Sequence, residues 1–450
     1  MTDHRHRKMC GSYLVHKMKD TQDTTLCVIE RGTFFSVAER LARGVKKVYY
    51  CPPNGEGFET AWRDSLGHNY PGVEAIRDFW PIKDEIDGFV FPDCRDWGLQ
   101  LELESQGFPV WGSKRAEDLE TMRGKWIDVA KDIGLPMPKT ETIQGLENLR
   151  VYLQEHKDEK KYVKISRYRG DMETWCAEDW PVTRNKLDSL AAKWQGLQNL
   201  LVFYVQDDLD TNIEAGADSY FVAGAFPDEL ILGYEKKNQG YIGAVMLRSE
   251  MPPEIFKPNE LIMPVLADFN YCNFFSTEVR VVDGEGHLLD PCCRCPTPAG
   301  EEQMEMLTNL PDIIWHGANG ILEQPKWAAK YCGQIAVSWT GEKTGAKVLR
   351  VPEEIRPWVK LYACAYTDDA FHFSPQQDPD GLASVVGIGD TPEEVIEHLK
   401  QLRQSMSGQP VDMPVEPLAD LIREIEEAKA MGIEFGAGHE LPEPAVVLDK

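Results

Sequence analysis

Short apolar runs alternate with helical spacings along the first quarter of the chain. Four of the runs are typical of buried strands and lie at residues 25–30, 46–51, 87–91 and 108–111. The segments 34–43 and 97–106 between them have the apolar spacing of helices, and Gly107 closes the second. Because strands that alternate with helices pack as a parallel sheet, residues 23–115 are predicted to form a doubly wound α/β domain.

The next segments mix helices and strands. Residues 117–133 have the spacing of one long helix, which stops at Gly134-Leu135-Pro136. Further helices are predicted at 183–194 and 259–269, and strands at 161–166, 200–206, 212–224 and 229–238. Residues 274–294 (FFSTEVRVVDGEGHLLDPCCR) then predict a hairpin whose two strands are joined by a turn at Asp283-Gly284-Glu285-Gly286.

The pattern changes after Trp315 to short strands. These are predicted at residues 359–366, 370–373 and 382–388, and two helices follow at 392–406 and 417–431. Thr391 or Asp390 in the N-cap position, with Pro392 at the first helical position, accounts for the start of the first of these helices. The last part of the chain is therefore expected to be small and rich in strands.

Composition and charge restrict the class of protein. With 450 residues, of which 42% are hydrophobic and 27% charged, the chain has the composition of a soluble protein of about two to four domains. No run approaches the roughly 18 apolar residues of a membrane helix, and a net charge of −26 argues against a nucleic-acid partner. The 11 cysteines are odd in number and scattered, which is typical of a reducing cytoplasm, where the protein is expected.

The hairpin at 274–294 carries the first candidate chemistry. Glu278 and Asp290 place one carboxylate on each arm, and Arg280 shares a face of its strand with Glu278. Two carboxylates facing one site are suited to Mg²⁺, which also binds nucleotide phosphates, and Arg280 and Arg294 are placed to clamp a phosphoryl group. The alternative is a surface hairpin with ordinary cross-strand ion pairs, and this stretch alone favours it.

The order of several motifs resembles the ATP-grasp superfamily. Residues 106–112 (QGFPVWG), followed by Leu119-Glu120, are similar to the junction where the first domain of these enzymes meets the nucleotide-binding fold. Residues 126–136 are similar to the helix and turn that come next, and the chain most resembles the phosphoribosylamine–glycine ligases, in the divergent form often carried by phages. The resemblance implies a tail at 1–22, a pre-ATP-grasp domain at 23–115, an ATP-grasp domain at 116–325 and a small C-terminal domain at 326–450.

The resemblance also implies a set of ATP contacts. Lys164, in the run VKIS, matches the lysine that contacts nucleotide phosphates, and a point charge at a strand end suits that role. An earlier basic contact is expected at Arg123 or Lys125. The loop after Lys164 has a single glycine, so Arg169 is expected to do by side chain what backbone amides do in relatives. Adenine and ribose are expected at Phe203, Tyr204, Val205, Gln206 and Glu214.

The residues around the reacting groups follow from the same resemblance. Lys236 and Lys237 fall where relatives have basic residues facing an acyl phosphate, although a charged loop has the same pattern. The expected catalytic residues are Lys237, Arg280 and Arg294, and the expected Mg²⁺ ligands are Glu278 and Asp290. Cys292 stands where relatives have Asn, a difference that removes a hard oxygen donor.

Two classes of function follow. An ATP-dependent carboxylate–amine ligase would use ATP and Mg²⁺ to activate a small-molecule carboxylate for attack by an amine, as a monomer or homodimer in the cytoplasm, that of the host if the protein is phage-encoded. A non-catalytic ATP-binding protein of the same fold is the alternative, favoured by Cys292 and the glycine-poor loop. The loop 30–35 (ERGTFF) has one glycine and a carboxylate where a sugar phosphate would approach, so an amine without a phosphate is expected.

Overall fold

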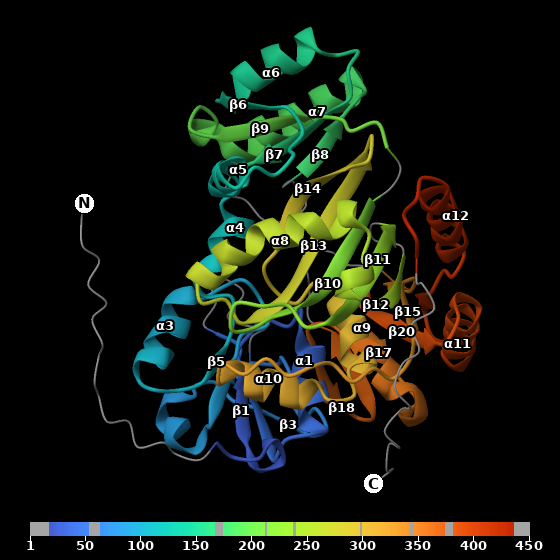
Figure 1. Cartoon of the computed structure of the whole chain (residues 1–450). Helices are drawn as coiled ribbons and strands as arrows, with labels where there is room; N and C mark the ends of the chain where they lie inside the picture. The colour runs from blue at the N-terminus through green and yellow to red at the C-terminus, as the bar shows by residue number, and fades with distance from the viewer. Residues whose placement is uncertain are drawn as a thin grey trace.

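The described residues form four β-sheets with helices packed around them (Figure 1). The structure, a computed structural model, describes residues 18–53, 64–166, 174–211, 214–236, 240–297, 299–342, 346–373 and 381–435. Short 3₁₀ turns connect the larger elements at η1 (Thr21–Asp23), η3 (Trp80–Glu85), η4 (Lys114–Ala116), η5 (Gln195–Leu197), η6 (Arg248–Glu250) and η7 (Glu353–Trp358).

The first sheet is parallel and confirms the predicted α/β domain. Its strands are β1 (Thr25–Val28), β2 (Lys47–Tyr50), β3 (Val73–Ala75), β4 (Gly88–Val90) and β5 (Val110–Trp111), in the order β3-β2-β1-β4-β5. Helix α1 (Phe35–Ala42) connects β1 to β2, and α3 (Trp97–Ser105) connects β4 to β5. The three-residue strand β3 was not predicted because its sequence, VEA, is too short to show a pattern.

A helical connection leads from this sheet to the second one. The predicted single helix over 117–133 is wrong, because the chain forms α4 (Glu117–Thr121) and α5 (Arg123–Asp132) instead. Met122 separates them with φ −121° and ψ 82°, outside the helical region. The break lets α5 take a direction of its own, and Arg123 is its first residue.

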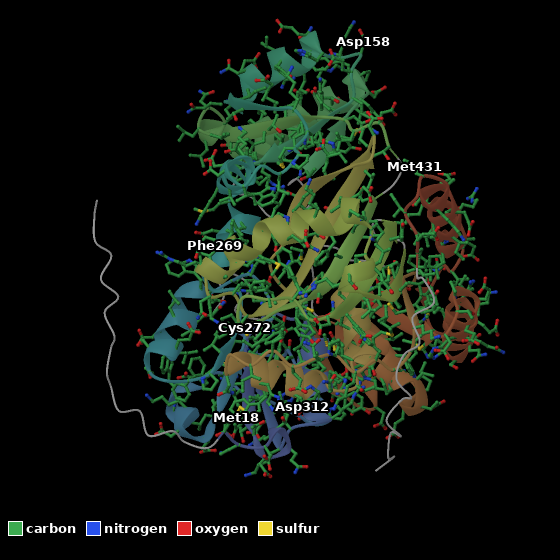
Figure 2. The ribbon with its side chains drawn as sticks, viewed as in Figure 1. Met18, Asp158, Phe269, Cys272, Asp312 and Met431 are labelled. Atoms are coloured by element: carbon green, nitrogen blue, oxygen red, sulfur yellow. The ribbon has the colours of Figure 1, made fainter. Side chains whose placement is uncertain are left out.

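The second sheet is a small four-stranded module. It contains β6 (Thr140–Gln144), β9 (Val202–Asp207), β7 (Lys161–Ile165) and β8 (Thr174–Ala177), in that order, with helices α6 (Leu146–Glu155) and α7 (Trp180–Trp194). Its apolar side chains form a hydrophobic cluster separate from the main core of the protein. The module lies at one end of the molecule, where Asp158 is labelled, and Met18 and Asp312 lie toward the other end (Figure 2).

The largest sheet has nine strands and runs through the centre of the molecule (Figure 1). Eight form the order β14-β13-β10-β11-β12-β15-β20-β17, and β21 (Val411–Asp412) pairs with β15. Their bounds are β10 (Glu214–Phe221), β11 (Glu229–Lys236), β12 (Gly240–Leu247), β13 (Asn273–Val282), β14 (Glu285–Cys292), β15 (Tyr331–Trp339), β17 (Val359–Leu361) and β20 (Gly381–Gly389). Helices α8 (Pro253–Asp268) and α9 (Ala299–Met306) pack against it, whereas α10 (Leu310–Ala318) packs against β4 and β5 of the first sheet.

The last part of the chain contributes both to the large sheet and to a sheet of its own. Strands β16 (Lys347–Leu349), β18 (Cys364–Thr367) and β19 (Ala370–Phe373) form the fourth sheet, and α11 (Pro392–Ser405) and α12 (Pro417–Ala430) follow. The predicted strand 359–366 is divided into β17 and β18, because Ala363 between them has a positive φ of 34°. Thr391 caps α11 as predicted, since its side chain accepts a hydrogen bond from the Glu394 N–H.

Candidate functional site

A cavity of about 630 Å³ lies between the four-stranded module and the large sheet. Strands β7 and β9 and helix α5 line it from one side, and β10, β11, β13 and β14 line it from the other. Of the predicted site residues, the cavity brings together Arg123, Lys164, Gln206, Glu214, Glu278, Arg280, Asp290 and Arg294. The sequence therefore located eight of the residues that share this space.

The two hairpin carboxylates face each other as predicted. Glu278 of β13 and Asp290 of β14 are direct Cα partners, and the register shifts immediately after them, between Glu278 and Val279. Along β13, Val279 and Val281 are buried in the hydrophobic core, whereas Glu278 and Arg280 are half-buried and line the cavity. This alternation is the two-residue period of a strand, so the hairpin presents both carboxylates on the cavity side.

Two cations from the opposite side of the cavity bind Asp290. Arg123 Nη1 lies 2.9 Å from Asp290 Oδ1, and Lys164 Nζ lies 2.6 Å from Asp290 Oδ2. Both cations are nearly buried, with 8% and 7% of their surfaces exposed. Of the two predicted alternatives, Arg123 lines the cavity, whereas Lys125 pairs with Asp118 at 2.6 Å and is not among the lining residues.

Two further arginines lie along the large sheet. Arg280 binds Glu214, its Cα partner on β10, through both Nε at 2.9 Å and Nη2 at 2.7 Å. Arg294 Nε lies 2.8 Å from Glu120 Oε1, and the Cys293 N–H donates to the other oxygen of the same carboxylate. Burial would lower the pKa of Arg294, but the nearby Cys292 and Glu120 raise it well above the usual value. Both arginines are thus held as cations at the cavity wall.

The predicted adenine hinge requires a correction. Phe203 and Val205 lie in the hydrophobic core of the four-stranded module. Tyr204 faces α5 and lies so close to it that a Cβ added at Gly124 would be 2.3 Å from the Tyr204 hydroxyl. The backbone of this stretch pairs with β6 on one side and β7 on the other, so its groups are used within the sheet. Gln206 is the predicted cofactor-binding residue of this stretch that does line the cavity, together with Asp207 at the end of the predicted hinge and with Leu209.

Lys236 points away from the site, contrary to the prediction. Gly233 and Glu235 of β11 line the cavity, so strand alternation turns Tyr234 and Lys236 to the opposite face. There Tyr234 packs edge-on against Phe435, and Lys236 forms an ion pair with Asp420 of α12. The predicted residues Arg169 and Lys237 lie outside the described residues.

The carboxylates fit a metal that the nucleotide helps to hold. In the described part of the chain, no three His, Cys, Asp or Glu side chains form a group that could hold a metal ion by themselves. Glu278 and Asp290 supply two hard oxygen donors, and Mg²⁺ is commonly bound by one or two carboxylates together with waters and substrate phosphates. The donor set therefore fits Mg²⁺ bound together with a nucleotide better than a permanent metal site.

Several lining residues were not singled out as site residues from the sequence. Glu120 and Thr174 contact the predicted cations, since Glu120 binds Arg294 and Thr174 Oγ1 lies 3.2 Å from Arg123. Asp218 and Tyr241 also line the cavity, and the Tyr241 hydroxyl donates to Asp218 Oδ2 at 2.5 Å. Asp218 lies four residues after Glu214 on one strand, so the alternation of β10 was a signal that could have identified it.

Comparison with known proteins identifies the fold. No protein-family model matches the chain, and no curated protein matches its sequence. Among solved structures, phosphoribosylamine–glycine ligase from Thermotoga maritima has a TM-score of 0.61 at 16% identity, over 86% of this chain and 97% of the other. The chain thus has the ATP-grasp fold, as the order of its motifs predicted, and its architecture is similar to that ligase.

Two other solved structures show how widely this fold is used. The biotin carboxylase domain of 2-oxoglutarate carboxylase from Hydrogenobacter thermophilus, a complex with MgADP, ADP and bicarbonate, has a TM-score of 0.61 at 12% identity, over 92% of this chain and 96% of the other. L-amino acid ligase from Bacillus licheniformis has a TM-score of 0.55 at 13% identity, over 87% and 99%. None of the described helices is long and apolar enough to cross a membrane.

Proposed function

We propose that this protein is an ATP-dependent carboxylate–amine ligase that works through an acyl phosphate. The observation that carries the proposal is the convergence of Arg123 and Lys164 on Asp290, opposite Glu278, inside a cavity of an ATP-grasp fold. Phosphoryl transfer needs little covalent chemistry from a protein, because positioning and charge neutralisation supply most of the catalysis. A site that gathers four cations and two facing carboxylates meets that need.

Each group has a role in this proposal. Lys164 and Arg123 bind the ATP phosphates, and a bound Mg²⁺ held by Glu278 and Asp290 would neutralise phosphate charge. Arg294, held by Glu120, stabilises the acyl phosphate as the amine attacks. Solved structures similar to this chain include a phosphoribosylamine–glycine ligase and an L-amino acid ligase, which supports amide formation as the reaction class.

The nucleotide base and ribose are assigned to the part of the cavity near the small module. Gln206, Asp207 and Leu209 line it there, and Glu214 lies opposite on β10. Glu214 is bound to Arg280, so Arg280 orients the carboxylate that is proposed to accept hydrogen bonds from the ribose. This role replaces the phosphoryl clamp that was predicted for Arg280.

The test is ADP release measured across a panel of amino acids and small amines, with and without Mg²⁺. Substrate-dependent ADP release that requires Mg²⁺ supports the ligase. ATP binding by calorimetry without ADP release for any pair of substrates would instead favour the non-catalytic ATP-binding protein. Cys292 lines the cavity beside the carboxylates, at a position where an oxygen donor was expected. This residue is the observation that favours the second candidate.

A further inference from the structure

Three glycines lie side by side in the large sheet, and two of them, Gly216 and Gly233, line the cavity. Gly216 of β10 is the Cα partner of Gly233 of β11, which is also the Cα partner of Gly243 of β12. A Cβ at Gly233 would lie 2.1 Å from the Tyr241 hydroxyl, and a Cβ at Gly243 would lie 2.9 Å from the ring of the same tyrosine. Gly233 and Gly243 therefore provide the space in which Tyr241 lies against the sheet.

From this position Tyr241 reaches a buried carboxylate. Its hydroxyl donates to Asp218 Oδ2 at 2.5 Å, and the hydroxyl of Ser276, the Cα partner of Asp218 on β13, donates to the same carboxylate. Asp218 is only 2% exposed, yet it lines the cavity. Since a carboxylate has about four lone-pair positions, two donors leave it able to accept further hydrogen bonds from a ligand.

Asp218 lies close to the residues proposed for phosphoryl transfer, but it is not one of them. Its partner Ser276 is two residues before Glu278 on the same face of β13. With about 4.8 Å between strands and about 3.4 Å per residue along a strand, the backbones of Asp218 and Glu278 lie roughly 8 Å apart. A small reactant bound to Asp218 can therefore reach a carbonyl carbon that is activated near Glu278.

Asp218 has no cationic partner among the residues that the structure describes. Within the described part of the chain it forms no ion pair, and the groups that face it are Tyr241 of β12, Ser276 of β13, Glu302 of α9 and Cys332 of β15. Burial raises the pKa of Glu302 well above its usual value, which favours the neutral form of this acid. A buried carboxylate without a cationic partner is costly, and a cationic ligand would remove that cost.

We propose that Asp218 binds the ammonium group of the amine substrate and accepts its proton. This inference rests on the proposed ligase function. One proton of R–NH₃⁺ moves to Asp218, and the lone pair freed on nitrogen forms the C–N bond with the acyl carbon. The C–O bond to phosphate breaks, phosphate leaves with the electron pair, and a second proton passes from nitrogen to phosphate. The amide keeps the third proton, and Asp218 releases its proton to water in the cavity.

The protonation of Asp218 suits this role. Burial raises its pKa to about 6, while the hydrogen bonds from Ser276 and Tyr241 act in the opposite direction. At neutral pH the group is therefore ionised and more basic than an exposed aspartate, as a proton acceptor near working pH should be. Tyr241 is a positioning residue, since it acts on the substrate only through Asp218.

Hydroxylamine provides a test that separates this inference from the ligase function itself. Hydroxylamine is uncharged at neutral pH and traps acyl phosphates as hydroxamates, so it needs no proton acceptor. Asp218→Asn should form hydroxamate at close to the wild-type rate but lose amide formation with an ammonium substrate by at least about 10²-fold. The loss should shrink as pH rises and free amine accumulates. Asp283→Asn, an exposed change at the hairpin turn, is the control.

The outcomes are distinct. If Asp218→Asn lowers hydroxamate and amide formation equally at every pH, Asp218 is structural and the inference is overturned. If the wild type forms no hydroxamate with ATP, Mg²⁺ and any standard amino acid as the carboxylate, the ligase function fails and the inference fails with it. Tyr241→Phe keeps the carboxylate and removes one donor, so it should raise the pH at which amide formation is half-maximal. An unchanged pH profile in that variant also overturns the inference.

Discussion

Lys164 Nζ lies 2.6 Å from Asp290 Oδ2, so a lysine of the four-stranded module and a carboxylate of the nine-stranded sheet meet across the cavity. Arg123 binds the second oxygen of the same carboxylate at 2.9 Å. In this arrangement the negative charge of Asp290 offsets part of the positive charge of the nearly buried Lys164 and Arg123. Phosphate oxygens are stronger partners for both cations, so binding of ATP is expected to draw Lys164 and Arg123 to the nucleotide and leave Asp290 for the metal.

Replacing Lys164 should therefore weaken nucleotide binding. ATP with Mg²⁺ is expected to raise the melting temperature of the wild type, because a ligand that binds only the folded state stabilises it. Lys164→Ala should lose most of that increase, as measured by differential scanning fluorimetry over a range of ATP concentrations. Lys125→Ala is the matched control, since Lys125 forms an equally short ion pair with Asp118 outside the cavity. Equal increases in both variants would show that Lys164 does not contact ATP.

Replacing either facing carboxylate by its amide should reduce turnover far more than stability. Glu278→Gln and Asp290→Asn are each expected to lower Mg²⁺-dependent ADP release by about 10²-fold or more, because the metal contributes to charge stabilisation in the transition state. The measurement is steady-state ADP release at increasing Mg²⁺, with unfolding curves recorded in parallel.

Two variants on the same hairpin serve as controls for the carboxylates. Asp283→Asn removes an exposed charge at the turn, where Asn tolerates the positive φ of 52°, and should leave turnover unchanged. Cys292→Asn adds an oxygen donor next to the carboxylates and should keep turnover or raise it. Near-normal turnover in Asp290→Asn would contradict the paired-carboxylate site.

The buried acid Glu301 should make stability depend on pH. Burial raises its pKa from 4.5 to about 7, while hydrogen bonds from Ser384 and Tyr362 oppose the shift. The folded state thus holds the proton more tightly than the unfolded state, so this contribution to stability is present below pH 4.5 and is lost as pH rises through 7. The shift corresponds to about 3 kcal/mol. As pH rises through this range, the free energy of unfolding of the wild type should fall by this amount relative to that of Glu301→Gln, as measured by urea titration. If the two free energies change with pH in the same way, the prediction is refuted.

Gly216 is expected to tolerate no side chain. A Cβ at this position would lie 2.2 Å from the backbone oxygen of Thr277 on the neighbouring strand, which cannot move without breaking the sheet. Gly216→Ala should therefore lower the free energy of unfolding by about 1–3 kcal/mol or more. Gly98→Ala is the control, because nothing lies within 4 Å of a Cβ there, and replacing this second residue of α3 by Ala should stabilise by about 0.4–1 kcal/mol. Chemical denaturation of both variants tests the contrast.

The loop after β1 should exclude a phosphorylated amine. The Glu30 carboxylate is buried and accepts hydrogen bonds from the Gly32 and Phe34 N–H groups at 2.7 and 3.0 Å, and Tyr50 binds its other oxygen. An internal carboxylate thus occupies the amides that a phosphate would need. ATP turnover with glycine and phosphoribosylamine should not exceed turnover with the best unphosphorylated amine. A clear preference for phosphoribosylamine would show that the phosphate binds elsewhere.

The hairpin and the first sheet were predictable because their signals are local. Alternation and a turn sequence are enough to place Glu278 opposite Asp290, and buried runs between helices are enough to define a parallel sheet. The direction of a side chain in the middle of a sheet is harder to predict. Lys236 was assigned to the wrong face because its charge pattern is the same on either side of β11, and only packing against α12 decides between them.

The remaining errors depend on contacts between distant parts of the chain. Phe203 and Val205 are apolar in sequence whether they face a nucleotide or a core, and the packing of α6 and α7 determines the latter. Asp218 gains its importance from Tyr241, which reaches it from two strands away over a glycine. No spacing within β10 alone contains that relationship.

The order of strands in the large sheet has a consequence for biosynthesis. Strand β12 ends at Leu247, but its neighbour β15 begins at Tyr331, and β20, which pairs with β15, ends at Gly389. A ribosome must therefore add every residue between Leu247 and Tyr331 while the edge of β12 has no partner, and unpaired strand edges are prone to join other chains. Such distant pairing also slows folding. Yield of soluble protein should thus depend on slow translation or on chaperones that cover this edge until β15 arrives.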